Sequence, residues 1–363
     1  MMGSAIAKDL STEYDVTVAD QDSHRLDELK NHRSIQTKAT DLSLSRNIQK
    51  VIQDADLVIG ALPGFMGFKT LNTVVGCEKN IVDISFFSED PFQLDSLAKE
   101  KGVTAVIDSG VAPGLCNIIL GYHNQKMKVE FYECLVGGLP FKRSQPFQYK
   151  APFSPLDVIE EYIRPARVVE NGRIVTKPSL SDVESLDIDP VGPIEAFNTD
   201  GLRTLLKTMK IPNMKEKTLR YHGHIIDIII LRESGFFDEE PVEIHGTTVR
   251  PIDVTSRVLS KKWKLEKDEP EFTVMRITIR GKEKGIKKQY IYHLYDQYNE
   301  ETKTSSMART TGYTCSAVAR LVLEGSFDEK GISPPEYVGA KVECFEKVIS
   351  DLEKRNIGIK CIS

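Results

Sequence analysis

Residues 3–10 read GSAIAKDL and residues 15–20 read DVTVAD, and the fold can be predicted outward from these two stretches. The first predicts a helix that begins at Gly3, and the second predicts an apolar strand that ends at Asp20. In dinucleotide-binding βαβ units, a glycine lets the helix pack closely on the sheet, the helix N-terminus faces the pyrophosphate, and an acid after the second strand binds the ribose hydroxyls. Asp20 lies 17 positions after Gly3, which suits this geometry.

The first strand and the first two glycines of such a unit should precede Gly3, where the sequence has only Met1 and Met2. We therefore expect a parallel sheet whose first strand is missing, either because the chain starts at an internal methionine of a longer gene or because it is a shortened variant. One glycine followed by one acid is also typical of a surface helix before an ordinary strand. The dinucleotide interpretation therefore depends on the residues that follow.

Strands and helices alternate over the next hundred residues. The pattern of apolar residues predicts strands at 35–39, 57–59, 81–84 and 103–107, and helices at 25–30, 44–52, 68–75 and 94–101. This alternation through short loops is typical of a Rossmann-type parallel sheet that helices cover on both faces. Ligands bind beyond the carboxyl ends of such strands. The residues at those ends that we predict to bind a cofactor are Gly3, Asp20, Asp41, Ala61, Leu62, Pro63, Asp108, Ser109 and Gly110.

Asp20 favours NAD over NADP, because a carboxylate at the ribose would repel a 2′-phosphate. The other strand ends each have a plainer interpretation. Asp41 could cap a solvent-exposed turn, the Ala61–Pro63 stretch could be an ordinary strand-to-helix turn, and residues 108–114 could be a rigid linker between domains.

From about Val129 the alternation stops. Residues 168–175 read VVENGRIV, a hairpin with the Asn-Gly turn of a type I′ loop, and Met275, Ile277 and Ile279 alternate with polar residues as in a strand with one wet face. We predict a Rossmann-type domain at 1–116 and a substrate-binding and dimerisation α+β domain with a mainly antiparallel sheet at 117–308. The helices within 309–363 could return to the first domain.

Composition is that of an ordinary globular protein of 363 residues, with 40% hydrophobic and 28% charged residues. The net charge, 48 − 53 = −5, favours neither a nucleic-acid nor a membrane partner. The six cysteines are scattered without a C-x-x-C motif, so we expect a cytoplasmic protein without a metal site. The edges of the antiparallel sheet could support a homodimer or a higher homo-oligomer.

Three further stretches carry a resemblance to a known family. They are DSGVAPGLCN at 108–117, EAFNTDGLRTL at 195–205 and SMARTTGYT at 306–314, supported by LRYHGH at 219–224. With the order of the elements, they resemble the saccharopine dehydrogenase-like family, and most of all its short members of the lysine 6-dehydrogenase type. The resemblance implies an NAD-dependent oxidative deamination of the side-chain amine of L-lysine, which yields aminoadipate semialdehyde, ammonia and NADH. Family members carry a fuller glycine fingerprint before the position of Gly3.

Oxidation of an amine requires the neutral amine, so a base must take its proton. The histidines His222 and His224, beside Tyr221, are the candidate catalytic residues that could titrate near neutral pH. An α-carboxylate calls for an arginine, and Arg143, Arg220 and Arg309 are the candidates. The α-ammonium could be held by Glu195, Asn198 and Asp200, although Asp200 could equally cap a helix at 201–206.

Two other functions remain open. Saccharopine dehydrogenase would act on a secondary amine that joins lysine and glutamate, but its substrate has three carboxylates and would need more than one arginine. A catalytically silent sensor of a nucleotide or an amino acid would bind its ligand without turnover.

Overall fold

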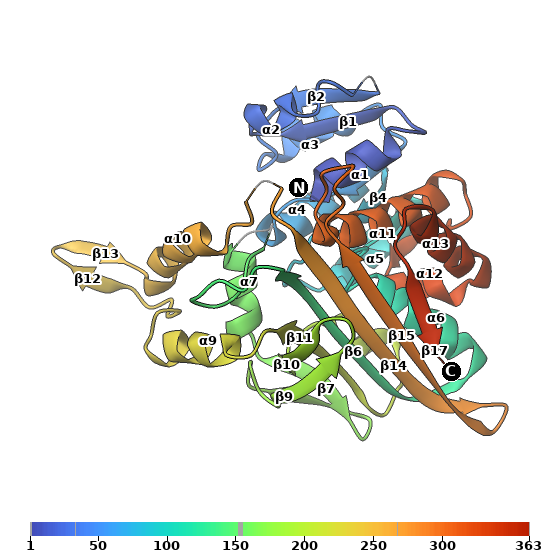
Figure 1. Ribbon diagram of the computed structural model, residues 1–363. Helices are drawn as coiled ribbons and strands as arrows, with labels where there is room; N and C mark the ends of the chain where they lie inside the picture. Colours follow the sequence, from blue (N-terminus) through green and yellow to red (C-terminus); the bar gives the residue numbers. More distant parts are fainter. Residues whose placement is uncertain (1, 33, 152–154, 267, 363) are drawn as a thin grey trace. The chain divides into compact units, whose positions relative to one another are not determined.

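The computed structural model describes residues 2–32, 34–151, 155–266 and 268–362. The chain forms two compact units. Unit 1 comprises Met1–Lys126 and Ala308–Ile357, and unit 2 comprises Met127–Met307 and Gly358–Ser363. Figure 1 shows the elements of both units in chain order. Among the helices of the described residues, none has the length and apolar character needed to cross a bilayer.

Parallel strands form the sheets of unit 1, as predicted. One sheet has two strands, β1 (Val16–Asp20) and β2 (Ile35–Ala39). The other has the order β16-β5-β4-β3, and its strands are β3 (Leu57–Gly60), β4 (Asn80–Asp83), β5 (Thr104–Val106) and β16 (Gly331–Ser333). Within the described residues β1 and β3 are not paired, so the six parallel strands belong to two separate sheets. The Rossmann-type prediction is confirmed in its parallel pairing and in its alternation of strands and helices.

Helices follow the strands of unit 1. They are α1 (Met2–Leu10), α2 (Ser23–Asp27), α3 (Ser45–Ile52), α4 (Gly64–Gly76), the 3-10 helix η1 (Pro91–Leu94), α5 (Asp95–Glu100), α6 (Leu115–Lys126), α11 (Ser306–Leu323), α12 (Pro335–Ala340) and α13 (Val342–Lys354). The first turn of α11 begins in unit 2, and the rest belongs to unit 1. A core of buried side chains that includes Leu71, Ile81 and Ala105 joins α4 to the four-stranded sheet. Helix α11 packs on α1, because a Cβ placed on Gly312 would lie 3.3 Å from Ile6.

Unit 2 is built on one mixed sheet, with the order β17-β15-β14-β6-β11-β10-β9 and with β7 and β8 attached beside β11. Its strands are β6 (Lys128–Pro140), β7 (Ala166–Glu170), β8 (Arg173–Lys177), β9 (Glu184–Ile188), β10 (Gly192–Asn198), β11 (Met214–Arg220), β14 (Glu271–Glu283), β15 (Ile286–Gln297) and β17 (Ile359–Ile362). All of these pairs are antiparallel except β6 with β11. The mainly antiparallel prediction is therefore confirmed, with one parallel pair that the sequence did not indicate.

Four helices and a small hairpin complete unit 2. They are α7 (Pro155–Ile163), α8 (Leu205–Thr208), α9 (His224–Glu233), α10 (Pro251–Trp263) and the hairpin of β12 (Val242–Ile244) and β13 (Thr247–Val249). The helix predicted at 201–206 begins only at Leu205. A tight turn at Lys284 and Gly285 joins β14 to β15, because the pairing of the two strands continues to Glu283 and Ile286.

Candidate functional site

The N-terminus of α1 and the turn after β3 lie together in unit 1. A Cβ placed on Gly3 would lie 3.6 Å from the Cβ of Ala61, so the predicted cofactor residues of two distant segments meet here. The first amides of a helix have no partner within it and favour an anionic ligand such as a pyrophosphate. Leu62 and Pro63 follow Ala61, and Pro63 precedes the first residue of α4. This arrangement fits a dinucleotide.

Asp20 and Asp41 lie at the carboxyl ends of the paired strands β1 and β2. The Asp20 carboxylate accepts a hydrogen bond from the Asp22 amide at 2.9 Å, and the Asp20 carbonyl accepts one from the Thr40 amide. The Asp41 carboxylate is fully exposed and accepts from the Ser43 amide at 2.8 Å. Hydrogen bonds from the Ser43 side chain and backbone lower the pKa of Asp41. Asp20 is thus held in place at a strand end, while Asp41 caps its own turn.

The loop from Asp108 to Gly114 is tightly folded. Asp108 is buried with a φ of 51°, and the Ser109 amide donates to the carbonyl of Asp83 at 2.9 Å. Gly114 has a φ of 136°, and a Cβ there would lie only 1.8 Å from the Gly110 carbonyl oxygen. A side chain at position 114 would therefore disrupt the loop. The loop lies within unit 1, so it is not the linker between domains that was the alternative interpretation.

The carboxylate of Asp83, at the end of β4, was missed by the sequence reasoning. It is fully buried and accepts hydrogen bonds from the Ser85 amide at 2.7 Å and the Ser85 hydroxyl at 3.3 Å. A Cβ on Gly60 would lie 1.8 Å from its Oδ2 atom, so the glycine at the end of β3 makes room for this carboxylate. Burial and the charge of Asp83 together raise the pKa of the Cys315 thiol. The signal in the sequence was an acid within the apolar strand predicted at 81–84.

In unit 2, the parallel strands β6 and β11 end at the same edge of the sheet, and Arg143 and Tyr221 follow these ends. The Tyr221 hydroxyl donates to the carbonyl of Pro140 at 3.0 Å. The guanidinium of Arg143 lies 4.1 Å from the centre of the Tyr221 ring, a cation–π contact. Because Arg143 is exposed, its planar fork can also bind a carboxylate.

His222 and Glu195 meet at this same edge. Glu195 lies on β10 opposite Arg220, and its Oε1 atom lies 3.0 Å from Nδ1 of His222. The imidazole side chain is 45% exposed, so its Nε2 can reach solvent or a ligand. Gln148 donates to the His222 carbonyl at 2.8 Å, and Gly223, with a φ of 93°, turns the chain from β11 into α9. The predicted residues form two contacting pairs, Arg143 with Tyr221 and Glu195 with His222, which the neighbouring positions 221 and 222 join in the chain. We call these four residues the edge group.

His224 and Arg220 instead lie in a buried network beside Tyr162. Nδ1 of His224 lies 2.7 Å from the carbonyl of Phe147 and must carry the proton, so Nε2 accepts from the Tyr162 hydroxyl at 2.9 Å. Arg220 donates to the Tyr162 hydroxyl at 3.3 Å and to Glu161 at 3.0 Å. Burial, and then the charge of Arg220, lower the pKa of His224 to about 3.

This network corrects two predictions. His224 does not titrate near neutral pH, because a fully buried imidazole cannot take up a proton beside a buried guanidinium. Arg220 is buried and its guanidinium already bonds Glu161, Tyr162 and its own strand. Neither side chain is placed to contact a substrate directly.

The remaining predicted substrate residues bond other protein groups. The amide of Asn198 donates to Ser181 and Asp182, and the carboxylate of Asp200 accepts two hydrogen bonds from the guanidinium of Arg167 at 2.9 and 2.8 Å. Arg309 belongs to unit 1, where it donates to the carbonyl of Arg355 at 2.9 Å. These contacts do not favour the predicted binding of the substrate carboxylate by Arg309, or of the substrate ammonium by Asn198 and Asp200.

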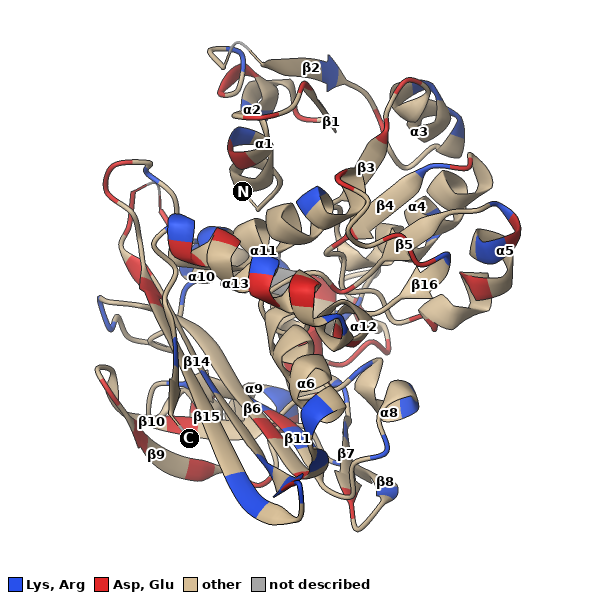
Figure 2. Ribbon diagram, turned by 90° about the vertical axis from the view of Figure 1, so that its right-hand side faces the viewer, with Lys and Arg blue, Asp and Glu red and all other residues tan. Residues whose placement is uncertain are grey.

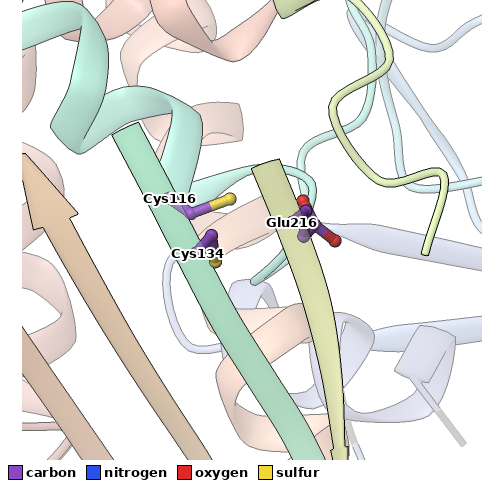
Figure 3. A group of neighbouring side chains, drawn as sticks. All are labelled: Cys116, Cys134 and Glu216. Carbon is purple, nitrogen blue, oxygen red and sulfur yellow. The ribbon is translucent and has the colours of Figure 1, made fainter. Parts of the chain in front are cut away.

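Two buried polar side chains on neighbouring strands were also missed. Cys134 on β6 and Glu216 on β11 are register partners (Figure 3). A Cβ on Gly201 would lie 1.8 Å from the Glu216 carboxylate, so the conformation of the segment after β10 depends on a glycine there. Figure 3 also labels Cys116, which lies at the start of α6 in unit 1.

Comparison with known families gives two matches that together span nearly the whole chain. The saccharopine dehydrogenase NADP binding domain matches residues 1–106, and the saccharopine dehydrogenase C-terminal domain matches residues 107–358. The boundary between the two matches follows β5.

Individual relatives agree with these matches. The chain is 26% identical over 226 residues to alpha-aminoadipic semialdehyde synthase of Arabidopsis thaliana, an alignment that covers 58% of this chain and only 21% of the relative, about a fifth of its length. It is 22% identical to the NADP(+), L-glutamate-forming saccharopine dehydrogenase of Pyricularia oryzae, over 84% of this chain and 83% of that one. The apo saccharopine dehydrogenase (L-Glu forming) of Saccharomyces cerevisiae has the same fold, with a TM-score of 0.79 at 17% identity over 100% and 98% of the two chains.

Proposed function

Because this chain belongs to the saccharopine dehydrogenase family, we propose that it is a nicotinamide-dinucleotide-dependent oxidoreductase that cleaves the bond between carbon and the side-chain nitrogen of a lysine derivative, with saccharopine as substrate. The Pyricularia relative, which aligns over most of both chains, carries that activity in its name, and this favours saccharopine over the free lysine that the sequence resemblance implied. The edge group is the observation that carries the proposal.

Such a reaction needs a group that binds the substrate carboxylate and a base that accepts a proton, and the edge group offers both. Arg143 binds a carboxylate of the amino acid, and its stacking on Tyr221 holds the guanidinium in a fixed plane. Glu195 accepts a hydrogen bond from the Nδ1–H group of His222, which leaves Nε2 as the free basic atom. A base whose ring is oriented by a carboxylate is the arrangement expected of a proton acceptor.

His222 takes the proton that the substrate ammonium must lose and releases it to solvent. It then takes a proton from the water that attacks the iminium carbon and gives it to the nitrogen as the carbon–nitrogen bond breaks. A bound nicotinamide would supply the hydride acceptor for this oxidation. The residues that would hold this cofactor in unit 1 are Gly3, Asp20 and the turn at Ala61–Pro63.

Oxidation of the primary amine of lysine is a second candidate, and the charge of the edge group favours it. Arg143 is the exposed arginine of the edge group, whereas Arg220 is committed to Glu161. One arginine matches the single carboxylate of lysine better than the three carboxylates of saccharopine.

For the cofactor, we propose NAD rather than NADP. Support comes from Asp20, a carboxylate fixed at the end of β1, which would repel a 2′-phosphate. The matching domain and the Pyricularia relative are both named for NADP, so the preference of this chain needs its own measurement.

The proposal is tested by the absorbance of NADH or NADPH formed from saccharopine and, separately, from lysine. Arg143→Gln should raise KM with little change in kcat, because the guanidinium binds a part of the substrate that does not react. Arg280→Gln is the matched control, since Arg280 also stacks on an aromatic ring, Phe131, at 3.8 Å but lies on β14.

Turnover of lysine alone would move the assignment to the second candidate. Binding of either amino acid without turnover would contradict both and support a silent sensor instead. Faster turnover with NADP would overturn the cofactor proposal and leave the substrate proposal intact.

A further inference from the structure

Exposed lysines gather where β6 begins and where the β14–β15 hairpin turns. We call this group the basic end, and its members are Lys128, Lys282, Lys284, Lys287 and Lys288. Lys128 is the first residue of β6, and the others lie on both sides of the turn that joins β14 to β15. Figure 2 shows blue residues at this end of the two strands.

Three of these lysines stand side by side on neighbouring strands. Lys282 on β14 is the register partner of Lys128 on β6 and of Lys287 on β15. Register partners point to the same face of a sheet, with Cβ atoms about 5 Å apart. Like charges at this separation repel each other, so the row weakens the pairing of its own strands. Natural sequences keep such a conflict chiefly where it serves a function.

Few acids balance these charges. Lys282 lies 3.9 Å from Glu130, and in the described part of the chain the other lysines of the basic end form no ion pair. The Glu283 carboxylate accepts a hydrogen bond from the Tyr290 hydroxyl at 2.7 Å. Five lysines and these two acids give a local charge of 5 − 2 = +3, in a chain whose net charge is −5. The net charge, which favours no membrane partner, conceals this local excess.

An exposed apolar side chain lies within the basic end. Ile286 is the first residue of β15, directly after the turn, and it is 65% exposed at the tip of the hairpin. Alternate residues of a strand share a face, so Ile286 and Lys288 lie on the face opposite to Lys287. Lysines therefore flank the tip on both faces of the hairpin. An apolar tip between cations fits a partner with an anionic surface and an apolar interior.

The basic end and the edge group lie at opposite ends of β6. Lys128 begins this strand, and Pro140, whose carbonyl accepts a hydrogen bond from Tyr221, ends it. A strand rises by about 3.3 Å per residue, so the two ends lie about 40 Å apart along β6. A partner bound at the basic end therefore leaves the edge group free.

We propose that the basic end docks this protein on the surface of a bilayer that contains anionic lipids. The lysines approach the headgroups, and Ile286 enters the boundary between the headgroups and the acyl chains. Clusters of about four to eight basic residues bind anionic lipids in this way. A nucleic acid would match the charges but would offer no apolar interior to Ile286. This inference is independent of the proposed activity.

Co-sedimentation of the full chain with lipid vesicles tests the proposal. The wild type should bind phosphatidylcholine vesicles that contain about one third phosphatidylserine, and it should not bind vesicles of phosphatidylcholine alone. Binding should be lost at about 1 M salt, where the Debye length is only about 3 Å.

A double variant tests the row of lysines. Lys282→Gln/Lys287→Gln should weaken binding to the mixed vesicles by about 25-fold, at about fivefold per lysine. It should also melt at a higher temperature than the wild type, because it relieves the repulsion within the row. Lys261→Gln/Lys262→Gln, on α10, is the matched control with the same change of charge, and it should bind like the wild type.

Ile286→Ser tests the apolar tip and should weaken binding by about tenfold without a change of charge. Absence of wild-type binding to the mixed vesicles would overturn the proposal, as would binding that the double lysine variant leaves unchanged. Retention of the wild type on immobilised DNA without binding to vesicles would also overturn it, and would assign the basic end to a nucleic acid.

Discussion

His222 and His224 are two residues apart, yet their surroundings give them different chemistry. His222 follows the end of β11 with an exposed ring and an acidic neighbour, Glu195. His224 begins α9 with its ring enclosed by Tyr149, Tyr162 and Trp263. The left-handed Gly223 between them turns the chain so that one ring faces out and the other in.

Replacement of His222 tests the proposed base. His222→Gln keeps a hydrogen-bonding group beside Glu195 but cannot take a proton, so kcat should fall by about 100-fold or more. The pH dependence of kcat/KM should also lose the limb that belongs to the base. His293→Gln, in the middle of β15, is the control and should have wild-type kinetics. A His222→Gln enzyme with normal kcat would exclude this histidine as the base.

His224 gives a prediction about stability. The pKa of its imidazole is about 3 in the folded protein and 6.5 in an ordinary environment, so the unfolded chain binds more protons between these values. The contribution of His224 to the free energy of unfolding should therefore be fully present above pH 6.5. Below that pH the free energy of unfolding should fall by about 1.4 kcal/mol per pH unit. Between pH 7 and pH 5 this loss is about 2 kcal/mol.

Urea unfolding at pH 7 and pH 5 measures this loss. His224→Gln should be less stable than the wild type at pH 7, because it disturbs the bonds to Phe147 and Tyr162, but it should lose about 2 kcal/mol less on acidification. An equal loss in both proteins would show that His224 does not control the acid sensitivity.

At the scale of the element, the sequence predicted turns and strands correctly where their conformation depends only on neighbouring residues. The Asn171-Gly172 turn has both residues at positive φ, 50° and 79°, as a type I′ turn requires. Strand β2 has the bounds predicted. The helix predicted from Gly201 begins only at Leu205, and Gly201 instead leaves space for the side chain of Glu216 from β11.

Two glycines of unit 1 allow a matched test of a close approach between elements. Gly60→Ala would place a Cβ 1.8 Å from the Asp83 carboxylate, so we expect a destabilisation of about 2–3 kcal/mol. Gly76→Ala, at the end of α4, meets no atom within 4 Å and should stabilise by about 0.5–1 kcal/mol. The midpoints of thermal unfolding of the two variants should shift in opposite directions. A Gly60→Ala variant with wild-type stability would contradict the predicted clash with Asp83.

On the scale of the whole molecule, segments from opposite ends of the chain build unit 1. Arg320 on α11 donates to Asp9 on α1 at 3.1 Å and to Glu13 at 2.9 Å. Strand β16 pairs with β5, in parallel with it. The nucleotide-binding unit therefore depends on residues more than 300 positions apart.

Hydrogen exchange with and without NADH tests the location of the cofactor. The protection of backbone amides against exchange should rise at the start of α1, around Asp20 and at the Ala61–Pro63 turn. It should stay unchanged in β8, which belongs to the β7–β8 hairpin of unit 2. Protection with NADPH should be weaker if Asp20 repels the 2′-phosphate. Protection restricted to unit 2 would contradict the placement of the cofactor.

By itself, the sequence determined the class of each half and the family, and it predicted all four members of the edge group. These follow from apolar periodicity, turn residues and contiguous motifs, which are properties of neighbouring residues. Only the tertiary structure decided which polar side chains remain available. His224, Arg220, Asn198 and Asp200 look as reactive in the sequence as His222 and Arg143. Their burial and their partners come from strands and helices distant in the chain, and so no local pattern could reveal them.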